Sequence, residues 1–213
     1  MPNEVLVKNK GLCDYEPMVS QMLTFTVERT NDSRDEIWLL QHPPVFTQGT
    51  SCKELPLIQD SNIPVVHSDR GGQITYHGPG QLICYLLLDL KRLGLGPKSF
   101  VNRVEQCLID LLGQYQITAN RKAGSPGVYV GEEKIAALGF RIKKGRCYHG
   151  LSLNIDMDLT PFEWINPCGY PGQAVTQMKT MFTHGDQDLR VETVSSQLLI
   201  YLSKEFGFTM KSQ

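Results

Sequence analysis

A cysteine in an irregular loop is the first residue of this chain that could carry out chemistry. Cys168 lies in the segment Asn-Pro-Cys-Gly-Tyr at 166–170, where proline and glycine predict that the thiol is presented rather than packed. The other five cysteines have mostly apolar strand or helix neighbours and are predicted to be ordinary buried thiols. Cys168 is therefore the candidate nucleophile, and an inert free thiol is the alternative, since most free cysteines are not catalytic.

A thiol with an ordinary pKa of about 8.5 needs a partner to become a thiolate at neutral pH. The candidates are Lys134, His77 and His149. Lys134 follows the turn Gly131-Glu132 and enters an otherwise apolar strand. Its ammonium either lies in solvent at the strand end, as most lysines do, or points inward as a fixed charge beside a pocket. A cysteine–histidine dyad is the commoner arrangement, and the residues alone leave both open.

The segment RGGQITYHGPGQ at 70–81 concentrates glycines and hydrogen-bonding side chains between two predicted strands. Glycine permits positive φ and a close approach of backbone N–H groups to a ligand. The pattern matches neither a phosphate-binding loop nor a dinucleotide-binding fingerprint. A tight structural connection is the alternative, but a mere turn does not need Arg70, Thr75, Tyr76 and His77 together. The segment is therefore predicted to bind a ligand, and the small residues Ala136, Ala137 and Gly139 predict room for a slender substrate.

Helices and strands in mixed order must position these residues. Helical periodicity predicts a first helix capped by Asp14 and two further helices at 98–115 and 188–206. Six strands are predicted, at 36–41, 64–67, 80–89, 127–130, 134–142 and 147–154. Hairpin turns at Gly131-Glu132 and Lys144-Gly145 make the last three a meander. The sequence thus predicts an α+β fold: a single domain over residues 1–213, with a mixed or largely antiparallel sheet flanked by helices.

Composition limits the classes of partner. Lys and Arg number 21 against 22 Asp and Glu, for a net charge of −1, so there is no overall basic field for nucleic acid. No segment has the length and apolar character of a membrane span, and the N-terminus lacks a secretory pattern. The six cysteines include no CxxC pair, which argues against a structural zinc site. A cytoplasmic protein without metal, nucleic-acid or membrane partners is expected.

Four segments together resemble the octanoyltransferases of lipoate biosynthesis, also called lipoyl(octanoyl) transferases. They are DEIWLLQHPPVFTQG at 35–49, RGGQITYHGPGQ at 70–81, GVYVGEEKIAALGFRI at 127–142 and YHGLSLNIDMDLTPFEWINPCGY at 148–170. The resemblance implies the fold of the biotin and lipoate protein ligases. It also implies transfer of an octanoyl group from octanoyl-acyl carrier protein to a specific lysine of lipoyl domains, without ATP or another cofactor. The acceptors would be lipoyl domains of 2-oxoacid dehydrogenases and the glycine cleavage H protein.

The same resemblance assigns roles to individual residues. It implies that Cys168 is the acyl-thioester nucleophile and that Lys134 lowers its pKa. The implied substrate-binding residues are Arg70, Gly71, Gly72, Gln73, Ile74, Thr75, Tyr76, His77, Ala137, Leu138, Gly139, Gly150, Leu151 and Ser152. The family often has serine at the position of Ala137, so a side-chain hydroxyl is absent there and only backbone contacts would remain.

Three other functions stay open at this point. An ATP-dependent lipoate or biotin protein ligase would form an adenylate and need no cysteine. A cysteine hydrolase would pair Cys168 with His77 or His149 and release octanoate. A non-catalytic acyl-binding module would keep Cys168 inert. For an acidic carrier protein, the best local basic patch comprises Lys91, Arg92, Arg141, Lys143, Lys144 and Arg146, although each residue alone is typical of a solvated hairpin tip.

Overall fold

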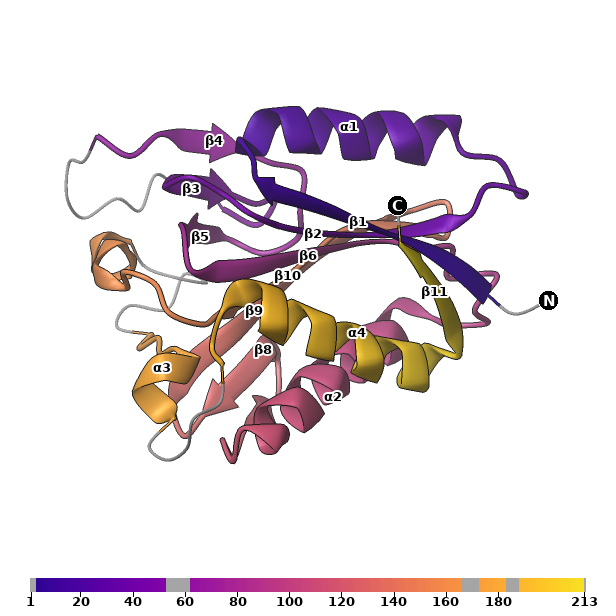
Figure 1. Ribbon diagram of the computed structural model, residues 1–213. Coiled ribbons are helices and arrows are strands. Elements are labelled where there is room, and N and C mark those ends of the chain that lie inside the picture. Colours follow the sequence, from indigo (N-terminus) through magenta and orange to yellow (C-terminus); the bar gives the residue numbers. More distant parts are fainter. Residues whose placement is uncertain (1–2, 53–61, 166–172, 183–187, 213) are drawn as a thin grey trace.

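A mixed sheet of eight strands lies at the centre of the computed structural model, which describes residues 3–52, 62–165, 173–182 and 188–212 (Figure 1). The strand order is β11–β1–β2–β6–β10–β9–β8–β7. β1 runs parallel to β11 and β2, and the other neighbours are antiparallel. In chain order the strands are β1 (Asn3–Leu12), β2 (Asp35–Gln41), β6 (Gln81–Leu87), β7 (Asn120–Lys122), β8 (Ser125–Val130), β9 (Glu133–Lys143), β10 (Arg146–Asn154) and β11 (Phe208–Ser212).

Helices cover both faces of this sheet. α1 (Tyr15–Glu28) lies on one face, and α2 (Pro97–Gln114) and α4 (Val191–Phe206) lie on the other (Figure 1). Successive residues of β6 therefore enter two separate apolar clusters, one shared with α2 and α4 and one shared with Met18 and Met22 of α1. A strand buried on both faces reads as a continuous apolar run, which explains the unbroken apolar stretch of β6.

A second, smaller sheet stands beside the end of the large one. Its order is β4–β3–β5, with β3 parallel to β4 and antiparallel to β5. The aromatic rings of Phe46 and Tyr76 from this sheet pack with Phe162 in a third apolar cluster. The elements are β3 (Val45–Gln48), β4 (Val65–His67), β5 (Ile74–His77), the 3-10 helix η1 (Thr160–Trp164) and the short α3 (Met178–Met181).

The predicted fold class is confirmed, with all three helices and all six strands present. The β8–β9–β10 meander is confirmed with its turns, and the last helix begins at Val191 rather than at 188. Five strands were not predicted: β1, β3, β5, β7 and β11. Two of these, β3 and β5, have four residues each and pair with one another although they are far apart in the sequence, so local pattern does not reveal them. Among the described residues, no helix is long and apolar enough to cross a membrane.

Candidate active site

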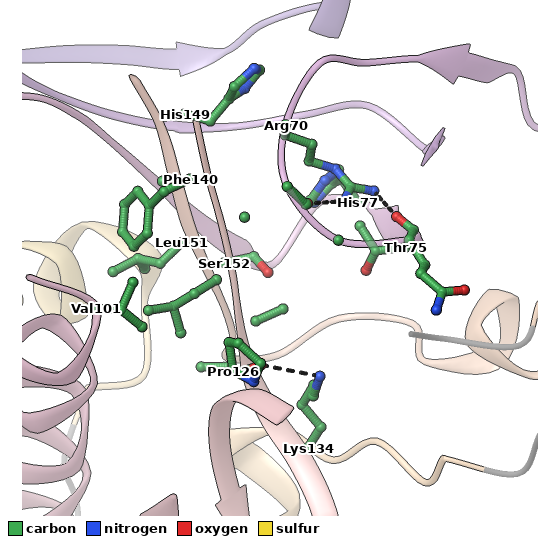
Figure 2. A pocket seen from close by; sticks show the side chains of 18 of the residues that line it. Arg70, Thr75, His77, Val101, Pro126, Lys134, Phe140, His149, Leu151 and Ser152 are labelled. Atoms are coloured by element: carbon green, nitrogen blue, oxygen red, sulfur yellow. Dashed lines mark hydrogen bonds between the residues drawn. The ribbon is translucent and has the colours of Figure 1, made fainter. Parts of the chain in front are cut away.

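A pocket of about 500 Å³ opens between the β9–β10 pair, the loop before β5 and the N-terminal part of α2. The residues that the sequence implicated converge on it. Figure 2 shows Lys134 at one end, Phe140 and His149 toward the other, and Arg70, Thr75 and His77 along one side. The implicated residues that line the pocket are Arg70, Gly71, Gly72, Gln73, Ile74, Thr75, His77, Lys134, Ala137, Leu138, Gly139, Gly150, Leu151 and Ser152. Tyr76 is the exception, because its ring packs between Phe46 and Phe162 instead.

Lys134 points inward from the start of β9. Lys134 is only 5% exposed, so the interpretation that its ammonium lies in solvent at the strand end is wrong. The ammonium Nζ lies 3.4 Å from the Pro126 carbonyl oxygen and 5.3 Å from the centre of the Tyr129 ring. Gly127 makes room for it: at φ +142, a Cβ there would stand 3.1 Å from Lys134 Cε. A positive charge is thus held out of water at one end of the pocket.

Arg70 is bound by its own loop. Its guanidinium donates from Nε to Thr47 Oγ1 at 3.0 Å, from Nη1 to the Gly71 carbonyl at 2.9 Å and from Nη2 to the Gln73 carbonyl at 2.7 Å. The loop backbone is also tied to the preceding segment, since Thr50 N–H donates to the Arg70 carbonyl and Ser51 N–H to the Gly72 carbonyl. Arg70 therefore shapes the pocket wall formed by residues 70–73.

The opposite wall combines small residues with an apolar side. Ala137 pairs with Ser152 and Gly139 with Gly150 across β9 and β10. A side chain is excluded at Gly150, where a Cβ would lie 1.8 Å from the Cys84 carbonyl oxygen, and crowded at Gly139, where a Cβ would lie 3.2 Å from the Gly71 carbonyl oxygen. The apolar lining comes from Val101, Leu138, Phe140 and Leu151, and Figure 2 shows Val101, Phe140 and Leu151 on the α2 side. This wall suits an unbranched apolar chain.

The two candidate histidines are both engaged with protein groups. Burial lowers the pKa of His77 to about 3, and its ring is therefore neutral. His77 Nδ1 lies 2.7 Å from Gln81 Oε1, and Nε2 lies 3.4 Å from Thr47 Oγ1. His149 has φ +59, and its Nε2 lies 2.8 Å from the Asp69 carboxylate. The partner of His149 is thus the Asp69 carboxylate.

Cys168 lies outside the described residues, but both flanks of its segment reach the pocket. Phe162 before the segment and Val175 after it line the cavity. Three other cysteines, Cys84, Cys107 and Cys147, are buried, and burial raises each thiol pKa, that of Cys107 to about 12. Cys13 and Cys52 are partly exposed, and neither lines the pocket.

Several residues around the pocket were quoted within motifs but assigned no role from sequence. Gln81 ends the glycine-rich motif, and Asn154 ends the apolar strand β10. Both are buried, with Gln81 Nε2 donating to Asn154 Oδ1 at 2.8 Å. The signal that could have found them is a polar amide at the end of an apolar strand, where burial requires a hydrogen-bond partner. Thr176, which accepts from Asn154, lay in a segment for which no element was predicted.

Comparisons with known proteins identify the family of this chain. The lipoyl protein ligase A/B catalytic domain model matches residues 15–203. The octanoyltransferase of Chromobacterium violaceum is 52% identical over 202 residues, covering 95% of this chain and 96% of that protein. The octanoyltransferase of Pseudomonas putida strain F1 is 57% identical over 171 residues, covering 80% of each.

Solved structures share the fold at low sequence identity. A bi-partite lipoate protein ligase from Thermoplasma acidophilum superposes with a TM-score of 0.72 at 13% identity, covering 100% of this chain and 87% of that chain. The biotin protein ligase of Aquifex aeolicus gives a TM-score of 0.55 at 14% identity, covering 96% and 70%. On these matches the chain belongs to the lipoyl protein ligase A/B catalytic domain family, among its octanoyltransferases, which are acyltransferase enzymes.

Proposed function

We propose that this chain moves an octanoyl group from the thioester of an acyl carrier protein to a lysine of a lipoyl domain, through a thioester on Cys168 and without ATP. The observation that carries the proposal is the buried ammonium of Lys134 at the end of a pocket with small and apolar walls. An ammonium in a water-poor site favours a nearby anion, here a thiolate. The small and apolar pocket walls fit the octanoyl group that the thiolate would receive.

Connectivity supports Cys168 as the nucleophile. The backbone of Lys134 is hydrogen-bonded to residues that follow the cysteine segment: Lys134 N–H donates to the Ala174 carbonyl at 2.9 Å, and Thr176 N–H donates to the Lys134 carbonyl at 3.0 Å. Ala174 comes only a few residues after Cys168 in the sequence. The three buried thiols have raised pKa values and are poor nucleophiles, and Cys13 and Cys52 do not line the pocket, which leaves Cys168 as the best candidate.

The chemistry proceeds in two balanced steps. In the first, the Cys168 thiolate attacks the thioester carbonyl of the donor, the bond from carbonyl carbon to carrier sulfur breaks, and the leaving thiolate takes a proton from Lys134. In the second, the neutral amine of the acceptor lysine attacks the new thioester, Cys168 leaves as a thiolate, and Lys134 accepts the amine proton. The first step exchanges one thioester for another and the second forms a more stable amide. No nucleotide is required for either.

Two protein partners follow. The acceptor is a lipoyl domain, of a 2-oxoacid dehydrogenase or the glycine cleavage H protein, and one structural relative is a lipoate protein ligase studied with its E2 lipoyl domain. The donor's acidic carrier would dock at basic side chains gathered around the β9–β10 turn. These are Lys91, Arg92, Arg141, Lys143, Lys144 and Arg146, of which Arg92 and Arg146 also donate to the Asn31 and Arg29 carbonyls respectively.

Intact-mass spectrometry after mixing the protein with octanoyl-acyl carrier protein, in the absence of ATP, tests the proposal. We expect a gain of one octanoyl group that hydroxylamine removes, that Cys168→Ser abolishes and that Lys134→Ala slows. Passage of this group to a lipoyl-domain lysine completes the assignment. Release of free octanoate without an acceptor would instead indicate a hydrolase. Modification of the acceptor only with ATP and free octanoate would overturn the proposal in favour of a ligase.

A further inference from the structure

A line of buried side chains leads from the glycine-rich segment to the backbone beside Lys134. His77 Nδ1 lies 2.7 Å from Gln81 Oε1, Gln81 Nε2 donates to Asn154 Oδ1 at 2.8 Å, and Asn154 Nδ2 donates to the Thr176 carbonyl at 2.9 Å. Gln81, Asn154 and Thr176 are 1%, 5% and 2% exposed. Buried amides are costly unless paired, so each of these bonds is needed by the groups that make it.

The direction of every bond follows from one carbonyl. The Thr176 carbonyl can only accept, so Asn154 presents its NH₂ group to it and its oxygen to Gln81. Gln81 then presents its oxygen to His77, whose proton must be on Nδ1. Hydrogen bonds that all run in one direction polarise one another, so each bond strengthens the next.

The Thr176 end of this chain fixes the backbone around Lys134. Residues 174–176 meet β9 only as an isolated parallel bridge of Val175 to Lys134, with one hydrogen bond on each side. A bridge this short is weak on its own. The Asn154 amide adds a buried anchor at Thr176, next to the bridge, and Val175 is held where it lines the pocket.

We propose that Asn154 is a positioning residue for octanoyl transfer: its amide holds residues 174–176 against Lys134 and thereby sets the geometry of the Lys134 end of the pocket. The inference rests on the proposed function, because it takes Lys134 to be the group that moves the proton. Asn154 also lines the pocket, but its amide oxygen accepts from Gln81 and its NH₂ group donates to the Thr176 carbonyl, so it acts through these bonds. Its loss displaces catalytic groups while leaving the loop at residues 70–73 in place.

Asn154→Asp gives the sharpest test. An ionised carboxylate still accepts from Gln81 but repels the Thr176 carbonyl, whereas a protonated carboxyl can donate to it and restore both bonds. Burial raises the pKa of such an acid, so the variant should approach wild-type kcat at low pH and fall behind as pH rises. At neutral pH we expect a loss of about 100-fold in kcat, the cost of a small misplacement, with KM for the donor nearly unchanged.

The ratio of variant to wild-type kcat is the quantity to plot against pH. The neighbouring titratable groups are His77, Lys134 and the Asp156–Lys179 ion pair. They occur in both proteins, but an anion at residue 154 also acts on them, so the hydrogen-exchange measurement below separates loss of the anchor from a charge effect. Gln41→Glu is the matched control, because the Gln41 side chain accepts from Gly80 N–H at 2.8 Å and an acid can still accept. Its ratio should stay flat. A flat ratio for Asn154→Asp, or a change in KM alone, would overturn the inference.

Amide hydrogen exchange keeps the inference separate from the proposed function. The Lys134 and Thr176 N–H groups should exchange faster in Asn154→Asp than in the wild type, and the β2–β6 amides should not change. Should the aspartate variant fail to fold, the uncharged Asn154→Ser replaces it, with faster exchange and lower kcat at every pH. Unchanged exchange at Lys134 and Thr176 would refute the role of Asn154 as an anchor. Faster exchange in the variant, together with a wild-type protein that forms no acyl adduct, would sustain the anchor and refute the proposed function.

Discussion

Arg70 and Lys134 are two buried cations beside one pocket, and the protein holds them in different ways. They are 8% and 5% exposed. The Arg70 guanidinium donates to Thr47 and to the Gly71 and Gln73 carbonyls at 2.7–3.0 Å. The Lys134 ammonium has a 3.4 Å contact to the Pro126 carbonyl and a 5.3 Å contact to the Tyr129 ring. Charge-assisted bonds are typically shorter than 3 Å, so Lys134 is held less tightly by these groups.

The comparison shows that burial of a cation does not by itself indicate chemistry. A guanidinium stays protonated at all physiological pH values and has a planar set of donors that suits a fixed loop. An ammonium in a desolvated site can lose its proton and regain it, which acid–base catalysis requires. Under the proposed function, Arg70 is therefore a structural cation and Lys134 the reactive one.

The same substitution at both positions should separate these roles, beginning with the larger effect. Lys134→Met keeps the length of the side chain and removes the charge. We expect kcat/KM for octanoyl transfer to fall by about 10²- to 10⁴-fold, the usual contribution of a general acid–base group. Stability should fall by less than activity, because methionine keeps the packing of the apolar stem of the side chain. Urea unfolding and steady-state kinetics on one preparation check both; a variant that loses stability in proportion to activity would contradict this assignment.

Arg70→Met should have the opposite profile. The Gly71 carbonyl and the Thr47 hydroxyl lose the guanidinium donors, the Gln73 carbonyl keeps only the Gly49 N–H, and a buried group left unpaired costs about 1–3 kcal/mol. A loss of several kcal/mol in the free energy of unfolding is expected, with a rise in KM and a smaller change in kcat. Urea unfolding measures the first and donor titration the second. Wild-type stability in this variant would mean that the loop keeps its shape without the guanidinium.

The strand that carries Lys134 was easier to predict from sequence than the contacts that hold Arg70. The β8–β9–β10 meander has clear periodicity and turn residues, so the strand that carries Lys134 was placed within one residue. Whether the ammonium points inward depends on a register shift between Val128 and Tyr129 and on pairing with Val175, which no local pattern encodes.

The surroundings of Arg70 depend on contacts between segments that are distant in the sequence. β5 lies in the glycine-rich segment that was expected to connect two strands. It was not recognised as a strand because its pairing partner β3 lies far back in the chain. The role of Arg70 depends on Thr47, and the bond from Gln81 to Asn154 joins residues 73 positions apart. Motif recognition identified the pocket lining well but could not say which polar residues contact a substrate and which hold the walls. Only the three-dimensional arrangement separates Arg70 from Lys134.

The smallest expected effect concerns cations that are neither buried nor bound by a loop. Lys143 and Lys144 are exposed at the β9–β10 turn, about 30 Å along β9 from Lys134 at the usual rise per residue. Charge at that distance is screened from the reacting atoms and can act only on docking of an acidic carrier. Replacing both with glutamate should raise KM for octanoyl-acyl carrier protein several-fold at low salt, less so at high salt, and leave kcat unchanged. Steady-state kinetics at two ionic strengths check this: a fall in kcat would mean that charge alone reaches the site, and an unchanged KM would place the carrier elsewhere.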